Sequence, residues 1–318
     1  MTTLQEQIVD PQQFVTLYGS TPPRADAPAE AIASAAARLA ERVSDLPLDG
    51  LVVYDVQDEH ERTDIPRPFP YQPTVDPRIY AQQLQEYTKA ATITYKSVGA
   101  MAEPTWLRWL HEAHHSYGLG LLTLVGASTP NPPPDALSAD RAMQLARTHA
   151  EHVMLGGVMI AERHTPAYRE SQRLIAKAAQ GCRFFISQVV YDPAPTARLL
   201  ADYAQDCRQQ GVTPQRIILT FSPCGRPATM TFIKWLGVAI SPQTEQAILS
   251  DPAPFTKSIQ ICCANLAAIL TVAATEGVPL GINIESVSVH KDELAASVEL
   301  VHALQAMADR AKMAGGSG

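Results

Sequence analysis

The sequence has few cysteines, no long apolar run and a shortage of basic residues, and each of these excludes a class of protein. Its five cysteines form no CxxC pair, which argues against a disulfide framework and against a structural zinc site. No stretch reaches roughly 18 uninterrupted apolar residues, so no membrane span is predicted. The net charge of −7 disfavours binding to nucleic acid or to an anionic membrane.

The two ends of the chain carry no targeting pattern. The N-terminal segment lacks the basic patch and apolar run of a secretory signal, so we expect a cytoplasmic protein. Residues 314–318 are small and glycine-rich, which predicts a flexible tail of the kind left by an engineered linker. The folded domain is therefore expected to cover residues 1–313.

What the sequence does contain is a regular alternation of short aliphatic runs with longer stretches rich in Ala, Leu, Gln and Arg. The runs predict eight strands, at residues 14–18, 51–55, 91–96, 120–125, 157–161, 183–190, 216–221 and 280–285. Strands separated by helices pair in parallel, because parallel neighbours need a crossover element. Eight such units with no composition break predict a single-domain α/β fold, a (βα)8 TIM barrel. Two doubly wound halves are the alternative.

Polar residues gather where the predicted strands end, on the barrel face that carries active sites. The second strand is followed by Asp55, Asp58, Glu59, His60 and Glu61, which form either a solvated loop or a source of a strand-end acid. This polar ring predicts a small polar ligand.

Three other strands also end in polar residues. Gln188 ends the sixth strand within an apolar run, and a buried amide there needs a hydrogen-bond partner, which a ligand can supply. Glu162 and His164 follow the fifth strand, and Asn283 and Glu285 end the eighth. For these four, a packing role and direct ligand contact are both open.

Several segments carry a family resemblance. They are residues 14–23 with their double proline, 61–63 (ERT), 162–166 (ERHTP), 186–192 (ISQVVYD) and 234–242. Together they resemble the methylenetetrahydrofolate reductase family, over most of the chain. That family folds as a (βα)8 barrel and transfers a hydride to 5,10-methylenetetrahydrofolate, giving 5-methyltetrahydrofolate. Most members use FAD reduced by NAD(P)H, and a flavin-free branch uses the nicotinamide directly.

The resemblance implies roles for individual residues. Gln188 matches a glutamine that contacts the folate and the nicotinamide-binding region. His164 and Lys177 match flavin-contacting positions, the lysine near the phosphates. Three further residues, in the matching segments, are candidates for cofactor binding: Glu162, Arg62 and Thr63. Asp55 and Asn283 are candidates for substrate binding.

The sequence also departs from the family pattern. Gly19 stands where the family has its general-acid glutamate, Val125-Gly126-Ala127 replaces an Arg-Gly-Asp that holds the flavin, and Thr92 replaces a histidine. Ring opening at the folate N10 needs an acid, and another strand-end carboxylate at the same mouth can take that role, although residual activity is conceivable without a replacement. Glu59 is the preferred replacement, and Glu285 is a second candidate for a catalytic residue. Asp55 and Glu162 are also available.

Three functions are consistent with this pattern. The first is a divergent reductase of 5,10-methylenetetrahydrofolate that uses NAD(P)H, directly or through FAD. The second is a barrel of the same ancestry that acts on another methylated folate. The third is a non-catalytic subunit that binds folate or flavin. A small folate is the expected ligand, and a homo-oligomer or a complex with a partner subunit stays open.

Overall fold

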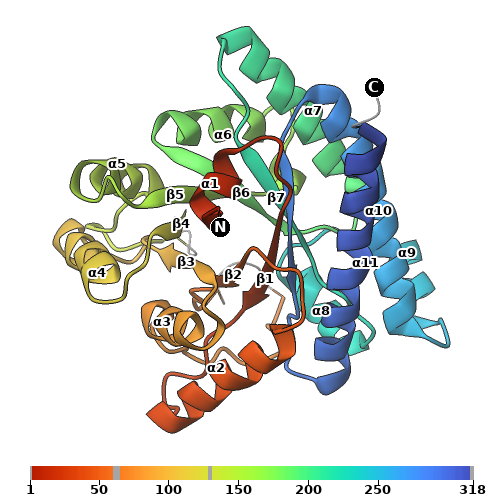
Figure 1. Ribbon diagram of the computed structural model, residues 1–318, viewed down its shortest axis with the longest axis horizontal. Coiled ribbons are helices and arrows are strands. Elements are labelled where there is room, and N and C mark those ends of the chain that lie inside the picture. Colours follow the sequence, from red (N-terminus) through yellow and green to blue (C-terminus); the bar gives the residue numbers. More distant parts are fainter. Residues whose placement is uncertain (1, 60–64, 128–130, 316–318) are drawn as a thin grey trace.

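A closed barrel of eight parallel strands, paired in sequence order from β1 to β8, forms the centre of the molecule (Figure 1). The computed structural model describes residues 2–59, 65–127 and 131–315. The strands are β1 (Val15–Ser20), β2 (Gly50–Val53), β3 (Ala91–Ser97), β4 (Leu121–Val125), β5 (Met154–Met159), β6 (Cys182–Val189), β7 (Arg216–Phe221) and β8 (Leu280–Glu285). The predicted single-domain (βα)8 barrel is therefore confirmed.

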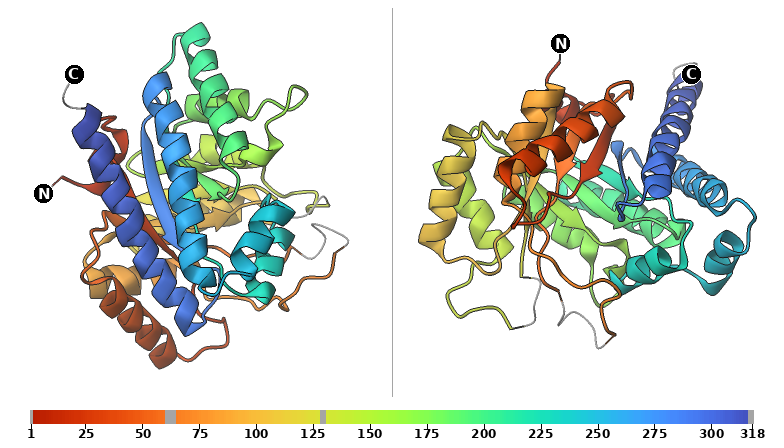
Figure 2. Two further views of the ribbon diagram at one scale, coloured as in Figure 1. Left: turned by 90° about the vertical axis from the view of Figure 1, so that its right-hand side faces the viewer. Right: turned by 90° about the horizontal axis from the view of Figure 1, so that it is seen from below.

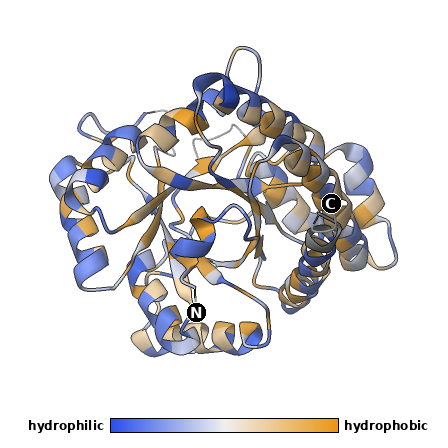
Figure 3. Ribbon diagram, turned by 45° about the horizontal axis from the view of Figure 1, so that its top comes forward, coloured by the Kyte–Doolittle hydropathy of each residue, from blue (hydrophilic) through white to orange (hydrophobic). Residues whose placement is uncertain are grey.

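Helices surround the barrel and turn their apolar faces toward the strands (Figure 3). The outer ring consists of α2 (Ala29–Val43), α3 (Pro77–Thr88), α4 (Glu103–His115), α5 (Ala139–His149), α6 (Glu170–Ala179), α7 (Pro193–Gln210), α10 (Pro254–Glu276) and α11 (Lys291–Gly315). A short 3-10 turn, η2 (Ala161–Arg163), follows β5, and two extra helices, α8 (Pro227–Trp235) and α9 (Pro242–Leu249), follow β7. The predicted domain boundary at residue 313 falls within α11.

Local sequence signals explain where the helices begin and end. The side chain of Asp192 accepts a hydrogen bond from the backbone of Ala194 at the start of α7, and Pro193 takes the first helical position. The helix ends at Gly211, whose φ of 66° lies in the left-handed region that glycine adopts without strain. These signals fix the length of α7 and so the direction in which the chain enters β7.

By length and composition, α10 could cross a membrane. It contacts α7 and α11 extensively, and its buried residues include Leu266 and Ile269. The helix is thus a member of the barrel's outer ring.

The position of β5 differs from the prediction, which placed this strand at 157–161. The strand runs from Met154 to Met159, so the predicted range began three residues too late and ended two residues too late. A Cβ on Gly156 would lie 2.3 Å from the ring of Phe184 on β6. Glycine is therefore needed inside the strand so that this ring can fill the barrel interior.

A short helix that the sequence analysis did not predict closes the N-terminal end of the barrel. This helix, α1 (Leu4–Val9), lies across the centre of the barrel in Figure 1 and begins with a capping box between Thr3 and Glu6. Its buried Leu4 and Ile8 pack onto apolar residues of the strands, among them Val15, Leu17, Val52, Ile93, Leu121, Phe184, Ile186 and Ile218.

Arg216, at the start of β7, fastens this helix to the barrel. Its side chain is buried, and its guanidinium donates to the carbonyl oxygens of Ile8 at 2.9 Å and Gln13 at 2.8 Å, and also to those of Gln7, Asp10 and Leu280. Burial lowers the pKa of Arg216 to about 10, so the side chain stays charged at neutral pH.

We expect Arg216→Leu to lower the free energy of unfolding by about 3–5 kcal/mol, because several buried carbonyl oxygens would lose their donor. Urea unfolding followed by circular dichroism measures the change. Arg208→Leu is the matched control, since Arg208 is 60% exposed and pairs with Glu276 at the surface, where an ion pair contributes at most about 1 kcal/mol. Equal losses in the two variants would contradict this role for Arg216.

Candidate functional site

A pocket of about 260 Å³ opens at the C-terminal ends of β1, β2 and β8, beside α8. Figure 2 shows the N-terminus at one end of the barrel and the loop that follows β2, together with α8, at the other. The pocket is lined by Gly19, Thr21, Tyr54, Asp55, Val56, Gln57, Glu59, Arg67, Phe232, Trp235, Leu236, Glu285, Ser286 and Val287. Four predicted site residues thus lie in or at one pocket: Asp55, Glu59 and Glu285 line it, and Asn283 contacts its wall through Tyr54.

The inner wall of this pocket is built by the closure of the barrel. In the pairing of β1 with β8, Gly19 lies directly opposite Glu285. A Cβ on Gly19 would lie 2.9 Å from the hydroxyl of Tyr54 and 3.2 Å from the Cβ of Glu285. The space beside the Gly19 backbone is therefore filled by Tyr54 and by the base of the Glu285 side chain.

Glu285 is held in an environment that favours its neutral form. Burial raises the pKa of Glu285 to about 7, although a hydrogen bond with Tyr54 opposes part of the rise. Burial and the nearby Glu285 carboxylate raise the pKa of Tyr54 well above its ordinary value, so the phenol stays protonated and donates. A carboxyl group that titrates near neutral pH is suited to giving and taking protons.

Asn283 links Tyr54, the hydrogen-bond partner of Glu285, to Thr220 on β7. The side-chain amide of Asn283 donates to the Tyr54 hydroxyl at 2.8 Å and to the Thr220 hydroxyl at 3.3 Å. Asn283 is fully buried, and its Oδ1 has no hydrogen-bond partner within the described ranges. The ring of Tyr95 packs edge-on against Tyr54, with ring centroids 5.0 Å apart. These contacts fix the direction in which the Tyr54 hydroxyl points.

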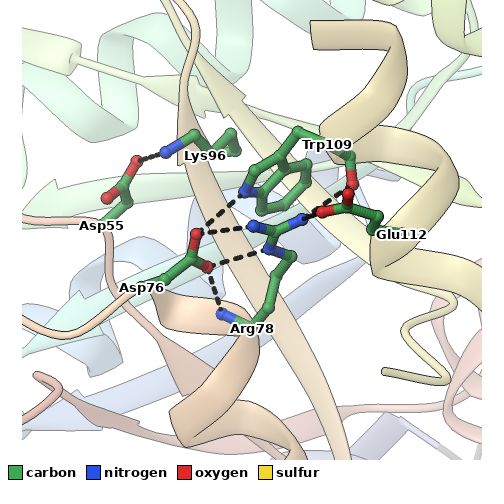
Figure 4. Close-up of polar contacts among 6 residues, drawn as sticks. All are labelled: Asp55, Asp76, Arg78, Lys96, Trp109 and Glu112. Atoms are coloured by element: carbon green, nitrogen blue, oxygen red, sulfur yellow. Dashed lines mark hydrogen bonds and ion pairs between the residues drawn. The ribbon is translucent and has the colours of Figure 1, made fainter. Parts of the chain in front are cut away.

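Asp55 lies on the pocket wall but is already paired. One of its carboxylate oxygens accepts from Lys96 Nζ at 2.8 Å and from the backbone of Ser97 at 2.9 Å. Lys96 lies 5.4 Å from the centre of the Trp109 ring, which in turn donates to Asp76 (Figure 4). This network ties the end of β2 to β3 and α4, so Asp55 is better placed to accept a hydrogen bond than to release a proton.

The outer wall is aromatic and carries a positive charge. The guanidinium carbon of Arg67 lies 5.1 Å from the centre of the Trp235 ring and 5.5 Å from those of Phe232 and Tyr71. Trp235 also donates to the carbonyl of Ile65 at 2.9 Å, which attaches α8 to the loop after β2. The wall is therefore made by two segments that are far apart in the sequence.

The predicted residues on β5 and β6 lie outside this pocket. Gln188 donates to the carbonyl of Leu236 at 2.5 Å, and Leu236 is one of the residues that line the pocket. Glu162 accepts from the backbone of Ala239, and burial raises its pKa.

The two residues expected near a flavin are each bonded to other groups of the protein. Lys177 donates to the carbonyl of Val158 at 2.8 Å, between α6 and β5, and burial lowers its pKa. His164 bonds to Asp202 at 2.8 Å and lines a second pocket of about 320 Å³, with Arg169 and Arg198. Arg62 and Thr63 lie outside the described residues. No group of three or more His, Cys, Asp or Glu in the described part of the chain is arranged to hold a metal ion.

No family model and no curated protein matches the chain. A solved structure does: an uncharacterized protein from Clostridium thermocellum that binds two copies of 5-methyl-5,6,7,8-tetrahydrofolic acid. It is 29% identical, with a TM-score of 0.81, and the match covers 96% of this chain and 99% of that one. A thermostable aldo-keto reductase matches with 10% identity and a TM-score of 0.50 over 90% of this chain and 89% of its own, which reflects the barrel alone.

The pocket residues that the sequence analysis missed include Tyr54, Arg67, Phe232 and Trp235. Tyr54 had a detectable signal, because it follows the inward-facing Val52 by two positions at the end of a strand. Arg67 lies in a proline-rich loop, and no local pattern links it to α8, so only the fold reveals that contact.

We expect Glu285→Gln to raise the free energy of unfolding by on the order of 3 kcal/mol at pH 8. The folded protein holds the Glu285 proton up to about pH 7, whereas the ordinary value is 4.5, so wild-type stability falls as pH rises between these values. The neutral amide avoids that loss.

Thermal unfolding at pH 5 and pH 8 measures this effect, and the gain should shrink toward pH 5. Glu299→Gln, on the exposed face of α11, is the control and should change little at either pH. A gain of the same size at both values would contradict a raised pKa for Glu285.

Proposed function

We propose that the pocket between Gly19, Tyr54, Glu285 and α8 binds a reduced folate, and that the protein reduces 5,10-methylenetetrahydrofolate with NAD(P)H. The observation that supports this most strongly is the position of Glu285. Its carboxyl, with a pKa near 7, lies opposite Gly19, the position at which the reductase family resemblance expects a general acid. The 5-methyltetrahydrofolate bound by the similar Clostridium thermocellum protein supports the choice of ligand.

The proposed reaction balances without any further reagent. Glu285 gives its proton to N10 as the bond between N10 and the methylene carbon breaks, which leaves an iminium at N5. A bound dihydronicotinamide would supply the hydride that this carbon needs to become the methyl group. NAD(P)⁺ and 5-methyltetrahydrofolate leave, and Glu285 regains a proton from water. Each turnover consumes one NAD(P)H and one proton.

The neighbouring residues have separate tasks in this scheme. Tyr54 hydrogen-bonds to Glu285 and keeps the carboxyl directed into the pocket. Asn283 orients Tyr54, and its free Oδ1 adds a buried acceptor near the same wall. Asp55, fixed by Lys96, is available to accept a hydrogen bond from an amino group of the pterin ring.

The three described residues that were expected to hold a flavin each have a partner within the protein. His164 belongs to a separate pocket, Lys177 is bonded beneath β5, and Glu162 is bonded to the loop after α8. We therefore propose that the hydride comes directly from the nicotinamide.

A second candidate function is the binding or use of a methylated folate without reduction. The similar structure is described with the methylated form bound, which corresponds to the product of the proposed reaction. A barrel that uses methylfolate in another reaction, or that binds it within a larger complex, would share the same pocket. Binding of 5-methyltetrahydrofolate without turnover of the methylene compound would favour this alternative.

We expect the purified chain to form 5-methyltetrahydrofolate from the methylene compound and NADPH or NADH under anaerobic conditions, with no added FAD. Mass spectrometry of the product measures this. Glu285→Gln should lower the rate by about 10²- to 10⁴-fold, as is typical for the loss of a general acid. In the wild type the rate should fall as pH rises through about 7, because the acid loses its proton there.

Glu59→Gln tests the competing acid, since Glu59 lines the same pocket. Loss of turnover in this variant, with turnover retained in Glu285→Gln, would assign the acid to Glu59. A complete lack of product with either nicotinamide, with or without FAD, would contradict the reductase proposal and leave the methylfolate alternative.

A further inference from the structure

Arg67 is held by aromatic rings and lacks the partners that a buried arginine needs. Its guanidinium lies over the rings of Tyr71, Phe232 and Trp235, on the wall of the pocket. Its Nε and Nη1 atoms are buried, and within the described ranges neither has a hydrogen-bond acceptor. Aromatic faces stabilise the charge of a guanidinium, but they leave the N–H groups at its edge unpaired.

Arg78 shows what a fully paired arginine looks like in the same molecule. Its guanidinium also lies over two rings, 4.8 Å from the centre of Trp109 and 5.2 Å from that of Tyr117. In addition, Asp76 accepts two of its hydrogen bonds and Glu112 a third, at 2.8–3.0 Å (Figure 4). Arg67 has the aromatic contacts of Arg78 but, among the described residues, no ion pair.

Within the described ranges, none of the three acidic residues that line the pocket, Asp55, Glu59 and Glu285, forms an ion pair with Arg67. Asp55 is bonded to Lys96, and Glu285 lies on the inner wall with its carboxyl bonded to Tyr54. The pocket therefore has two chemically different ends, a protonatable carboxyl inside and a guanidinium among aromatic rings outside. A ligand that satisfies both ends has a hydrogen-bonding ring at one end and an anion at the other.

We propose that Arg67 binds a carboxylate of the glutamate tail of the folate, while the pterin ring lies toward Glu285. This inference rests on the proposed function. A carboxylate matches the planar edge of a guanidinium and can accept two hydrogen bonds from it. The rings of Phe232 and Trp235 then lie beside the path between the two ends, where the aminobenzoate part of the ligand can stack.

Arg67→Gln tests this assignment with two ligands that differ in the tail. We expect the variant to bind 5-methyltetrahydrofolate about 10- to 100-fold more weakly than the wild type, the range expected for lost hydrogen bonds to a charged group. It should bind 6-methyltetrahydropterin, which has the ring but no tail, with unchanged affinity. Isothermal titration calorimetry measures both. Arg67→Lys keeps the positive charge but loses the planar set of N–H donors, so its affinity for 5-methyltetrahydrofolate should lie between those of Arg67→Gln and the wild type.

Arg198→Gln is the matched control, because this exposed arginine lines the second pocket, and folate affinity should not change. Equal weakening of both ligands by Arg67→Gln would assign Arg67 to the integrity of the pocket and overturn the proposal. So would weaker binding of NADPH alone, which would assign Arg67 to a phosphate.

The two proposals fail in different ways. If the wild type does not bind 5-methyltetrahydrofolate, the proposed function and this inference are both wrong. If the wild type binds it and Arg67→Gln binds it equally well, only the role of Arg67 is wrong.

Discussion

The pairing of β1 with β8 is the constraint on which the rest of the structure depends. It joins the two ends of the sheet in a register that runs from Val15 opposite Gly281 to Gly19 opposite Glu285. Because side chains alternate between the two faces of a strand, a slip of one residue would turn Asn283 and Glu285 toward the helices. The pocket wall therefore depends on this register, and Arg216 secures the other end of the same barrel by joining β7, β8 and α1.

The environment of Glu285 lowers the stability of the folded protein above neutral pH and gives this carboxyl a pKa suited to proton transfer. The half-buried carboxyl of Glu285, beside Tyr54 and Gly19, holds its proton to about pH 7, and ionising it in the folded state costs free energy that a surface glutamate does not lose. Gly19 makes this arrangement possible, since any larger side chain there would meet Tyr54. Gly19 on β1 and Glu285 on β8 are thus two parts of one packing arrangement.

Much of the fold was predictable because its signals are local. Aliphatic runs and helical stretches repeat eight times, and the strand-end positions of Asp55, Asn283 and Glu285 follow from counting along each run. The start of β5 was predicted wrongly because Gly156 is required by the Phe184 ring of a neighbouring strand, a contact that the local sequence does not contain. Arg67 and Trp235 come together only through the packing of α8 on the loop after β2, so their shared wall could not be predicted.

The two sides of the barrel mouth differ in whether the polar side chains discussed above have hydrogen-bond partners. On the side of β5 and β6, the side chains of Gln188, Glu162 and Lys177 are bonded to backbone groups of the protein itself, which leaves them few free hydrogen-bonding positions. On the side of β1, β2 and β8, Asn283 Oδ1 and two nitrogens of Arg67 have no partner in the described residues. Buried polar groups without partners cost free energy, and a bound ligand can recover it. Other buried polar atoms of the described residues are also unpaired, among them His164 Nδ1 at the second pocket, so the unpaired nitrogens of Arg67 support the proposed ligand together with the pocket that Arg67 lines.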